Sequence, residues 1–504
     1  MPIRALAVAA AAAIALTTLA ASPASATTDP GVVKVGDGWL RGSVAADHVT
    51  YSSIPYAAPP VGERRWKPPA AAKSWRGIRD ATQPSPLCPQ GSMTGATGTE
   101  DCLYLDVTVP RKAGKRLPVV VWLYGGGFTS GGAQQYDATR FATAGELIVV
   151  TPNYRLGALG FLAAPALGGG GNYGLMDQTA ALRWVRENVA RFGGDPRNVT
   201  LAGQSAGARS VCAHLAAPSS RGLFQRAITQ SGACENKVLT PAKAQDFGAR
   251  ATADLGCTTA ACLRSVAPER LLPLLNGGRV PVHSRADDRP WGPVAGTTFL
   301  PRQPGEAIRI GRAARVPLLL GGTRDEMRGF VSNDAALTEA GYRTMMVETF
   351  GAQADVVLAK YPAAAYDSPA LALATVLGDW GGFVGACPVL RTAQAAARHQ
   401  RVYAYEFAED SRQTEPYPLG AYHSLDLPYL WDVSFPNNFP PLTAEQQELS
   451  AQIIDRWAAF AHTGSPNWPS FNRTSTVTGL SAEGLTPTPY GRTHHCDFWA
   501  GLPR

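Results

Sequence analysis

The sequence feature that most constrains the fold is an apolar run at residues 119–124, Val-Val-Val-Trp-Leu-Tyr, which has no polar face. Strands that are buried on both faces are typical of parallel sheets covered by helices. Shorter runs at 148–151 and 199–202 repeat the pattern, and a helical periodicity over 176–192 lies between them. This alternation predicts an α/β fold with a mostly parallel central sheet flanked by helices.

Other segments extend this pattern on both sides. Residues 103–109 alternate as a half-buried strand does. The last long helix is expected to begin at Thr443, which forms a capping box with Gln446. Residues 241–315 have weak patterning and predict a helical insertion over the sheet, and since no repeat or long linker divides the chain, we expect residues 27–504 to form one domain. Two further strand-like runs lie at 317–321 and 402–407.

The N-terminal segment differs in composition from the rest. Arg4 precedes an alanine-rich apolar run at residues 5–21, and Ala24-Ser25-Ala26 has the small-x-small pattern that signal peptidases cleave. We therefore predict a secretory signal peptide over residues 1–26 and an extracellular mature chain that starts at Thr27. The short run and the cleavage pattern disfavour an uncleaved membrane anchor. No later segment is long and apolar enough for stable membrane insertion.

Charge and cysteine content exclude other classes of partner. The formal net charge of +7 falls to +6 when Arg4 is removed with the signal peptide, and no Lys/Arg run suggests a nucleic-acid partner. Eight cysteines in an exported chain favour disulfides over metal or redox chemistry. The neighbourhoods Cys212-Ala213-His214 and His494-His495-Cys496 lack a recognisable zinc spacing, so we expect no metal. Sequence alone leaves the disulfide connectivity open.

A Gly-x-Ser-x-Gly element, Gly203-Gln204-Ser205-Ala206-Gly207, stands between a predicted strand and a predicted helix. A strained turn at this junction lifts a serine hydroxyl clear of the backbone, and the two glycines allow close packing around it. A small-residue turn with no catalytic role is the alternative. The strand–turn–helix setting favours Ser205 as a nucleophile.

A glycine tract supplies a second catalytic element. Gly125-Gly126-Gly127 and then Phe128 follow directly after the apolar strand that ends at Tyr124. Glycines can direct backbone N–H groups into a site without obstruction from side chains. The N–H groups of Gly126 and Gly127, with that of Ala206, are expected to form an oxyanion hole for a tetrahedral intermediate.

Short motifs in a fixed order connect these two elements to a known family. They are Ile54-Pro55-Tyr56-Ala57, Pro59-Pro60-Val61-Gly62, Glu100-Asp101-Cys102-Leu103-Tyr104-Leu105, Asn153-Tyr154-Arg155 and Asn172-Tyr173-Gly174-Leu175-Met176-Asp177-Gln178. With the serine turn, this series resembles the type-B carboxylesterase/lipase family, which includes the cholinesterases. The resemblance extends over essentially the whole mature chain. It implies an α/β-hydrolase fold, with helical insertions around the sheet, and hydrolysis of carboxylic esters.

The resemblance also implies the other members of a catalytic triad, whose order in this fold is nucleophile, acid, histidine. It assigns Glu326 as the acid, with the adjacent Asp325 as the alternative. It places the catalytic histidine at His423, in the loop before Leu427. The remaining histidines after the acid are His399, His462, His494 and His495.

Further positions are carried over from the family. Gln204 and Ser231 match positions beside the triad, although Ser231 could equally be a plain strand-end serine. Phe128, Trp291 and Phe330 fall where the family forms its substrate pocket. The resemblance supports three disulfides, Cys88–Cys102, Cys257–Cys262 and Cys387–Cys496, and leaves Cys212 and Cys234 either paired or as buried thiols.

The sequence therefore predicts a secreted serine carboxylesterase that acts on small-molecule esters through an acyl-enzyme, without cofactor or metal. A binding or adhesion protein of the same fold is the main alternative, and the presence of every triad member disfavours it. A serine peptidase is the nearer alternative. A cholinesterase is disfavoured because no tryptophan lies between Cys88 and Cys102, and because Gln204 replaces an acidic residue. The oligomeric state stays open.

Overall fold

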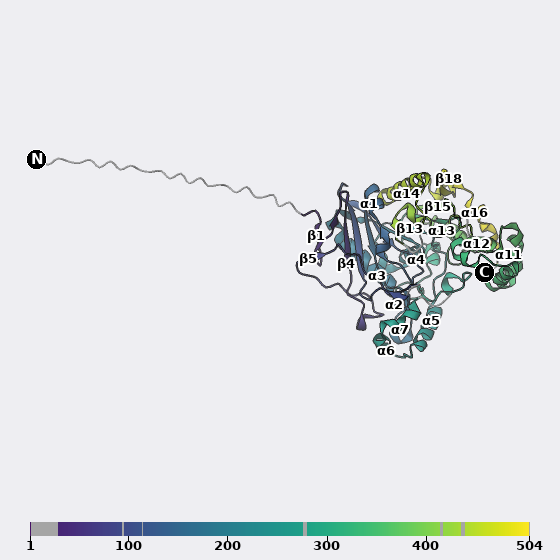
Figure 1. Cartoon of the computed structure of the whole chain (residues 1–504), viewed down its shortest axis with the longest axis horizontal. Helices are drawn as coiled ribbons and strands as arrows, with labels where there is room; N and C mark the ends of the chain where they lie inside the picture. Colours follow the sequence, from purple (N-terminus) through teal and green to yellow (C-terminus); the bar gives the residue numbers. More distant parts are fainter. Residues whose placement is uncertain are drawn as a thin grey trace.

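The computed structural model describes Met1 and residues 29–92, 95–112, 114–275, 280–413, 417–434 and 439–502. Apart from Met1, the predicted signal peptide and its cleavage site lie outside the described residues. Figure 1 shows a central sheet with helices packed around it.

The sheet is mixed and has a parallel centre. Its described strands are β3 (Ser43–Val44), β4 (His48–Pro55), β8 (Tyr104–Pro110), β9 (Leu117–Leu123), β11 (Ile148–Pro152), β12 (Gly194–Gln204), β13 (Arg226–Gln230), β14 (Leu318–Thr323), β15 (Val402–Phe407), β17 (Val477–Ser481) and β18 (Gly484–Thr488). They lie in the order β18-β17-β15-β14-β13-β12-β9-β11-β8-β4-β3. The neighbours from β17 to β11 are parallel, and antiparallel strands extend both edges. The predicted α/β architecture is confirmed.

Burial explains why the central strands form. Every residue of β9 is buried, as the apolar run at 119–124 predicts. In β15, Tyr403 and Tyr405 point to one face, where their rings contact Phe460 and Trp457. Alternate side chains of a strand point to opposite faces, so Glu406 lies on the other face.

Helices cover both faces of this sheet. On one side, α14 (Ala444–Thr463) supplies Phe460 and Trp457 and contacts α1 (Thr139–Ala144). On the other, α3 (Tyr173–Asn188), α4 (Ala206–Ala216) and α13 (Ala386–Ala396) pack against the parallel strands. The sheet is therefore enclosed, as its apolar central strands require.

The helix boundaries follow local capping signals. Thr443 and Gln446 form the predicted reciprocal capping box at the start of α14. The helix predicted over 176–192 begins three residues earlier, at Tyr173, and ends in a 3-10 turn before Gly193. Gly193 has a φ of 88°, a left-handed conformation that closes the helix and directs the chain into β12.

The weakly patterned insertion forms a helical lobe beside the sheet. Its helices are α5 (Pro241–Asp254), α6 (Ala260–Ser265), α7 (Pro268–Leu275) and α8 (Pro304–Arg309). Figure 1 shows α5, α6 and α7 gathered together below the sheet. The apolar interior of this lobe includes Trp291 and continues to Phe128, so the lobe packs behind the glycine tract.

All eight cysteines form disulfides. Three of the pairs are those that the family resemblance implies, Cys88–Cys102, Cys257–Cys262 and Cys387–Cys496. The fourth joins Cys212 to Cys234 and thereby ties α4 to the segment that follows β13. Because α4 begins directly after Ser205, this bond holds the helix beside the serine turn.

Candidate active site

Four predicted site residues come from adjacent parallel strands. Ser205 follows β12, Ser231 follows β13, Glu326 follows β14, and His423 lies in the loop after β15. The strands are neighbours in the order β12-β13-β14-β15. The carboxyl ends of parallel strands meet at one edge of a sheet, where α/β proteins place their sites.

The Ser205 turn is strained in the way that the five-residue pattern predicts. Ser205 has φ 55° and ψ −119°, and its backbone N–H donates to the Gln230 carbonyl oxygen at 2.8 Å. A Cβ at Gly207 would collide with the Leu123 carbonyl oxygen, and one at Gly203 would lie 2.6 Å from the Gly207 carbonyl carbon. Both glycines are therefore required where β12 turns sharply into α4.

His423 contacts the second carboxylate of the Asp-Glu pair. Its Nδ1 atom lies 2.5 Å from Oε2 of Glu326, and both side chains are largely buried. The other Glu326 oxygen accepts a hydrogen bond from the Thr323 N–H at 3.0 Å. Glu326 is thus fixed at one end by β14 and bonded to the imidazole at the other.

Asp325 has a different set of partners. Its carboxylate pairs with Arg328 at 2.9 Å and accepts the backbone N–H of Ala421 at 2.9 Å. The Asp325 N–H in turn donates to the Ala421 carbonyl oxygen. Asp325 therefore holds the loop that carries His423, whereas Glu326 contacts the ring itself.

The second imidazole nitrogen faces the serine turn. The amide nitrogen of Gln204, the residue before Ser205, lies 3.2 Å from His423 Nε2 and also donates to Ser424 Oγ at 3.0 Å. An amide N–H donor at Nε2 and a carboxylate at Nδ1 favour the tautomer with its proton on Nδ1. That tautomer leaves Nε2 able to accept a proton. Among the described residues Ser205 Oγ makes no hydrogen bond with His423, a contact that is often long in an unliganded site.

The other histidines considered from the sequence lie elsewhere. His399 bonds the Arg309 carbonyl oxygen and His462 bonds that of Gly145. His494 lies between the carboxylates of Asp379 and Glu406, at 2.6 Å from each. The ring of His495 packs against the ring of Tyr361.

The glycine tract lies against the serine turn. A Cβ at Gly125 would come within 3.1 Å of the Ser205 Cβ. Gly126 and Gly127 have φ values of 104° and 63°, which glycine adopts without strain. In the described part of the chain, the N–H groups of Gly126, Gly127 and Ala206 have no hydrogen-bond acceptor. Three backbone donors therefore remain available beside Ser205.

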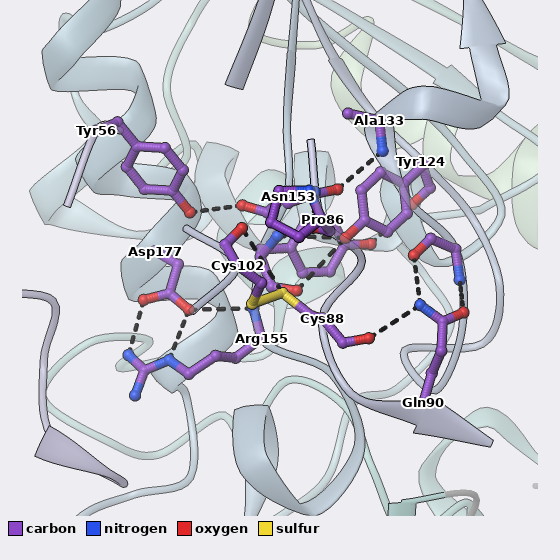
Figure 2. The surroundings of a disulfide bond; sticks show 12 residues. Tyr56, Pro86, Cys88, Gln90, Cys102, Tyr124, Ala133, Asn153, Arg155 and Asp177 are labelled. Carbon is purple, nitrogen blue, oxygen red and sulfur yellow. Dashed lines mark hydrogen bonds and ion pairs between the residues drawn. A yellow bond between two sulfur atoms is a disulfide. The ribbon is translucent and has the colours of Figure 1, made fainter. Parts of the chain in front are cut away.

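Both ends of the glycine loop are anchored. At its start, the Tyr154 hydroxyl donates to the Tyr124 carbonyl oxygen at 2.7 Å, and the two rings stack. At its end, the Gln90 side chain accepts from the Gly131 N–H at 2.9 Å and donates to the Gly131 carbonyl oxygen at 3.0 Å. Figure 2 shows Gln90 reaching this loop from the arm that the Cys88–Cys102 disulfide closes.

The motif residues around Asn153 support the segment that leads into this arm. Asn153 donates to the Pro86 carbonyl oxygen at 2.8 Å and accepts the Ala133 N–H at 2.8 Å. Arg155 forms a buried two-pronged ion pair with Asp177, with two bonds of 2.7 Å, and burial raises the pKa of Asp177. These contacts, visible in Figure 2, tie the arm, the glycine loop and α3 together.

The three predicted pocket residues lie in different settings. Phe128 is fully buried, and its ring contacts that of Phe161. Trp291 is also buried and donates from Nε1 to the Leu274 carbonyl oxygen at 2.6 Å. Phe330 is 38% exposed, and its ring centroid lies 5.1 Å from that of His423. Of the three, Phe330 alone contacts His423 within the described residues.

Ser231 lies in a tight turn after β13, packed against β14. It is fully buried, has a φ of 52°, and its N–H donates to the Gly321 carbonyl oxygen at 2.8 Å. Its hydroxyl has no hydrogen-bond partner among the described residues. A Cβ at Gly322 would lie 3.7 Å from the Ser231 Cα, so little room separates this turn from β14.

Several residues close to the site are absent from the predicted set. Asp426 is buried three residues after His423, accepts from the Gln230 amide at 2.8 Å, and burial raises its pKa to about 6. Arg209 and Arg289 are the others. No sequence pattern singles out these three residues, because their roles depend on which hydrogen-bonding partners the fold places near them.

The described residues provide neither a metal-binding cluster nor a helix that could cross a membrane. Within that part of the chain, no group of three or more His, Cys, Asp or Glu side chains is placed to hold a metal ion. No described helix combines the length and apolarity that crossing a bilayer requires.

A strained serine turn after a parallel strand, with an acid and a histidine after later strands, defines the α/β-hydrolase class. Residues 29–499 match the model of the Carboxylesterase family. The para-nitrobenzyl esterase of Bacillus subtilis is 34% identical over 485 residues, covering 90% of this chain and 95% of that protein. The fumonisin B1 esterase of Sphingopyxis macrogoltabida is 34% identical over 501 residues, covering 92% and 90%.

Solved structures agree with the sequence comparison. The structure of a PNB esterase matches with a TM-score of 0.80 and 34% identity, covering 92% of this chain and 99% of that one. A carboxylesterase of Geobacillus stearothermophilus gives the same values. The chain belongs to the carboxylesterase family and is a carboxylic ester hydrolase.

Proposed function

We propose that this protein is a secreted serine carboxylesterase in which Ser205, His423 and Glu326 form the catalytic triad. The observation that carries the proposal is the 2.5 Å contact between His423 Nδ1 and Glu326 Oε2, beside the strained Ser205 turn. The contact orients the imidazole so that Nε2 faces the serine turn.

The reaction proceeds through an acyl-enzyme. His423 Nε2 takes the hydroxyl proton as Ser205 Oγ forms a bond to the ester carbonyl carbon. The tetrahedral intermediate collapses, the C–O bond to the alcohol breaks, and the imidazolium returns its proton to the departing alkoxide. Water then attacks the acyl-enzyme with His423 again as base, which releases the carboxylic acid and restores Ser205.

Backbone donors stabilise the negative oxygen of each tetrahedral intermediate. The N–H groups of Gly126, Gly127 and Ala206 have no acceptor in the described part of the chain and lie beside Ser205. They are oriented before the reaction begins, so no reorganisation energy opposes the step. Loss of one such donor typically reduces kcat by about 10²–10³.

The setting of this activity is extracellular, with one catalytic domain at residues 27–504. The signal-peptide pattern of residues 1–26 supports export, and four disulfides suit an oxidising compartment. The substrates are small-molecule carboxylic esters, in keeping with relatives named para-nitrobenzyl esterase and fumonisin B1 esterase.

Hydrolysis of p-nitrophenyl esters from acetate to palmitate tests the proposal, with Ser205→Ala and His423→Ala compared with the unaltered protein. Ser210→Ala is the matched control, since this serine lies on the same helix and accepts a bond from Gln178. We expect turnover that both site variants lose by at least about a thousandfold and that the control retains. Full activity in Ser205→Ala, or none in the unaltered protein on any ester, would overturn the proposal.

A further inference from the structure

A buried arginine lies one helical turn after the proposed nucleophile. Arg209 is 7% exposed, and its backbone N–H donates to the Ser205 carbonyl oxygen. Its guanidinium lies 5.3 Å from the ring centroid of Phe128, the residue that follows the oxyanion glycines. Its Nε is buried, and no described residue accepts a hydrogen bond from its side chain.

A second arginine approaches from the helical lobe. The Arg289 guanidinium lies 4.0 Å from the ring centroid of Phe383, whose ring contacts Phe330, and Phe330 contacts the His423 ring. The Arg289 Nε is also buried and, among the described residues, has no acceptor. Arg209 therefore packs on the residue that follows the oxyanion glycines, and Arg289 is linked to His423 through the rings of Phe383 and Phe330.

The two cations affect each other. Burial, and then the positive charge of Arg289, lower the pKa of Arg209 to about 10, while Asp287 acts weakly in the opposite direction. Burial likewise lowers the pKa of Arg289. Both remain cations at neutral pH, and it is costly to hold the buried Arg209 near the half-buried Arg289 when neither has an acceptor among the described residues.

Nearby carboxylates do not neutralise this pair. Asp287 is already bonded to Lys243 at 3.0 Å, and Asp288 to the same lysine at 2.7 Å. Three cations therefore accompany two carboxylates in this cluster, so positive charge is in excess. A planar guanidinium with free N–H groups is suited to two-pronged binding of a carboxylate.

We propose that Arg209 and Arg289 bind a carboxylate carried by the acyl half of the ester, so that the substrates are monoesters of dicarboxylic acids. This inference rests on the proposed function, because it takes Ser205 as the acylated residue. We assign the carboxylate to the acyl half because Arg209 lies on the helix that begins after Ser205. Its guanidinium also packs beside Phe128, the residue that follows the oxyanion glycines. The alcohol half leaves with a proton from His423.

Two matched ester pairs test the substrate class in the unaltered full-length protein. The first pair is mono-p-nitrophenyl adipate and p-nitrophenyl hexanoate, which differ by a carboxylate in place of the terminal methyl. The second is 4-carboxyphenyl hexanoate and phenyl hexanoate, with the charge on the alcohol half. We expect kcat/KM to favour the adipate ester over hexanoate by about tenfold to hundredfold, the usual effect of charge-assisted hydrogen bonds, and no such preference in the second pair.

Variants then assign the preference to the two arginines. Arg209→Met and Arg289→Met should each lower the adipate-to-hexanoate ratio at least tenfold. Arg285→Met is the matched control, because this exposed arginine lies in the same segment as Arg289 and packs on Trp380. It should leave the ratio unchanged. The ratio in the unaltered protein tests the proposal even where a buried substitution prevents folding.

The outcomes separate this inference from the function on which it rests. Turnover of hexanoate with equal or poorer turnover of the adipate ester would overturn the inference alone. So would a ratio that neither arginine variant changes, or a preference confined to the alcohol half. Failure to hydrolyse any of the four esters would overturn the proposed function, and the inference with it.

Discussion

Glu326 and Asp325 are adjacent in sequence but bind different parts of one loop. The Glu326 carboxylate lies 2.5 Å from His423 Nδ1, whereas the Asp325 carboxylate accepts the Ala421 N–H at 2.9 Å and pairs with Arg328. One carboxylate therefore orients the imidazole, and its neighbour holds the backbone that carries it.

This division predicts unequal losses of activity. Glu326→Gln should lower kcat/KM by about 10³–10⁴, because an amide no longer stabilises the imidazolium or holds the required tautomer. Asp325→Asn should cost about tenfold or less, since one loop contact weakens while Glu326 stays in place. Steady-state kinetics on one p-nitrophenyl ester compares the two, and a larger loss in Asp325→Asn would contradict the assignment.

The glycine loop offers a second test, in which alanine substitutions at two neighbouring glycines are compared. A Cβ at Gly126 would collide with the Ser130 carbonyl oxygen, whereas a Cβ at Gly127 meets only Thr129 Oγ1, at 3.7 Å. Gly126→Ala should therefore displace the loop and lower kcat by about 10² or more, the effect of losing a backbone donor. Gly127→Ala has room for the methyl group but holds alanine at a φ of 63°, so it should reduce kcat less than Gly126→Ala without leaving it unchanged. A kcat in Gly126→Ala equal to that of the unaltered protein would show that this loop does not carry the donors.

Gln90 is predicted to position the same loop without touching substrate. Gln90→Leu removes both hydrogen bonds to Gly131, so kcat should fall about tenfold to a hundredfold, part of the effect of a lost donor, while KM changes little. Gln83→Leu is the control, because Gln83 is exposed and its side chain bonds Thr82. A loss that appears in KM alone would argue that Gln90 acts on substrate binding instead.

His494 lies away from the site, and its raised pKa predicts that the stability of the protein depends on pH. Burial disfavours its charged form, but hydrogen bonds with Asp379 and Glu406 outweigh this and raise the pKa of His494 to about 9. A histidine with a raised pKa in the folded state stabilises the protein fully below its unfolded pKa of about 6.5, and this contribution is lost as the pH rises through 9. The free energy of unfolding should therefore fall between pH 6.5 and 9, by at most about 3 kcal/mol.

Urea unfolding across this pH range checks the prediction. His494→Gln should lower stability most near pH 6 and flatten the decline toward pH 9. His399→Gln should keep the slope, because His399 bonds a backbone carbonyl oxygen and no described carboxylate pairs with it. A slope that persists in His494→Gln would assign the pH dependence to other groups.

The sequence predicted the strands that are buried on both faces, because such strands appear as continuous apolar runs. The strand predicted at 402–407 coincides with β15, and β9, β11 and β14 agree within two residues at each end. The strand β13 was not predicted, because Arg226, Thr229 and Gln230 interrupt its apolar pattern. These polar side chains are accommodated by partners that only the fold brings near, such as Asp426 for Gln230.

The candidate site divides in the same way. The serine turn and the glycine tract are recognisable because each has a local pattern, whereas His423 was assigned from the family resemblance. The structure places all three at one edge of the sheet. The pairing of Cys212 with Cys234 depends on contacts between distant segments, and so does the lack of acceptors for Arg209 and Arg289 among the described residues. Sequence spacing carries no information on such contacts, so these features emerge from the structure alone.

Covalent labelling of the nucleophile tests the central claim most directly. The protein would be treated with diethyl p-nitrophenyl phosphate, which phosphorylates activated serines, and the modified residue located by peptide mass mapping. We predict one adduct, on Ser205, formed in step with complete loss of esterase activity and absent from His423→Ala. An adduct at another serine, or activity that survives full modification of Ser205, would contradict the account.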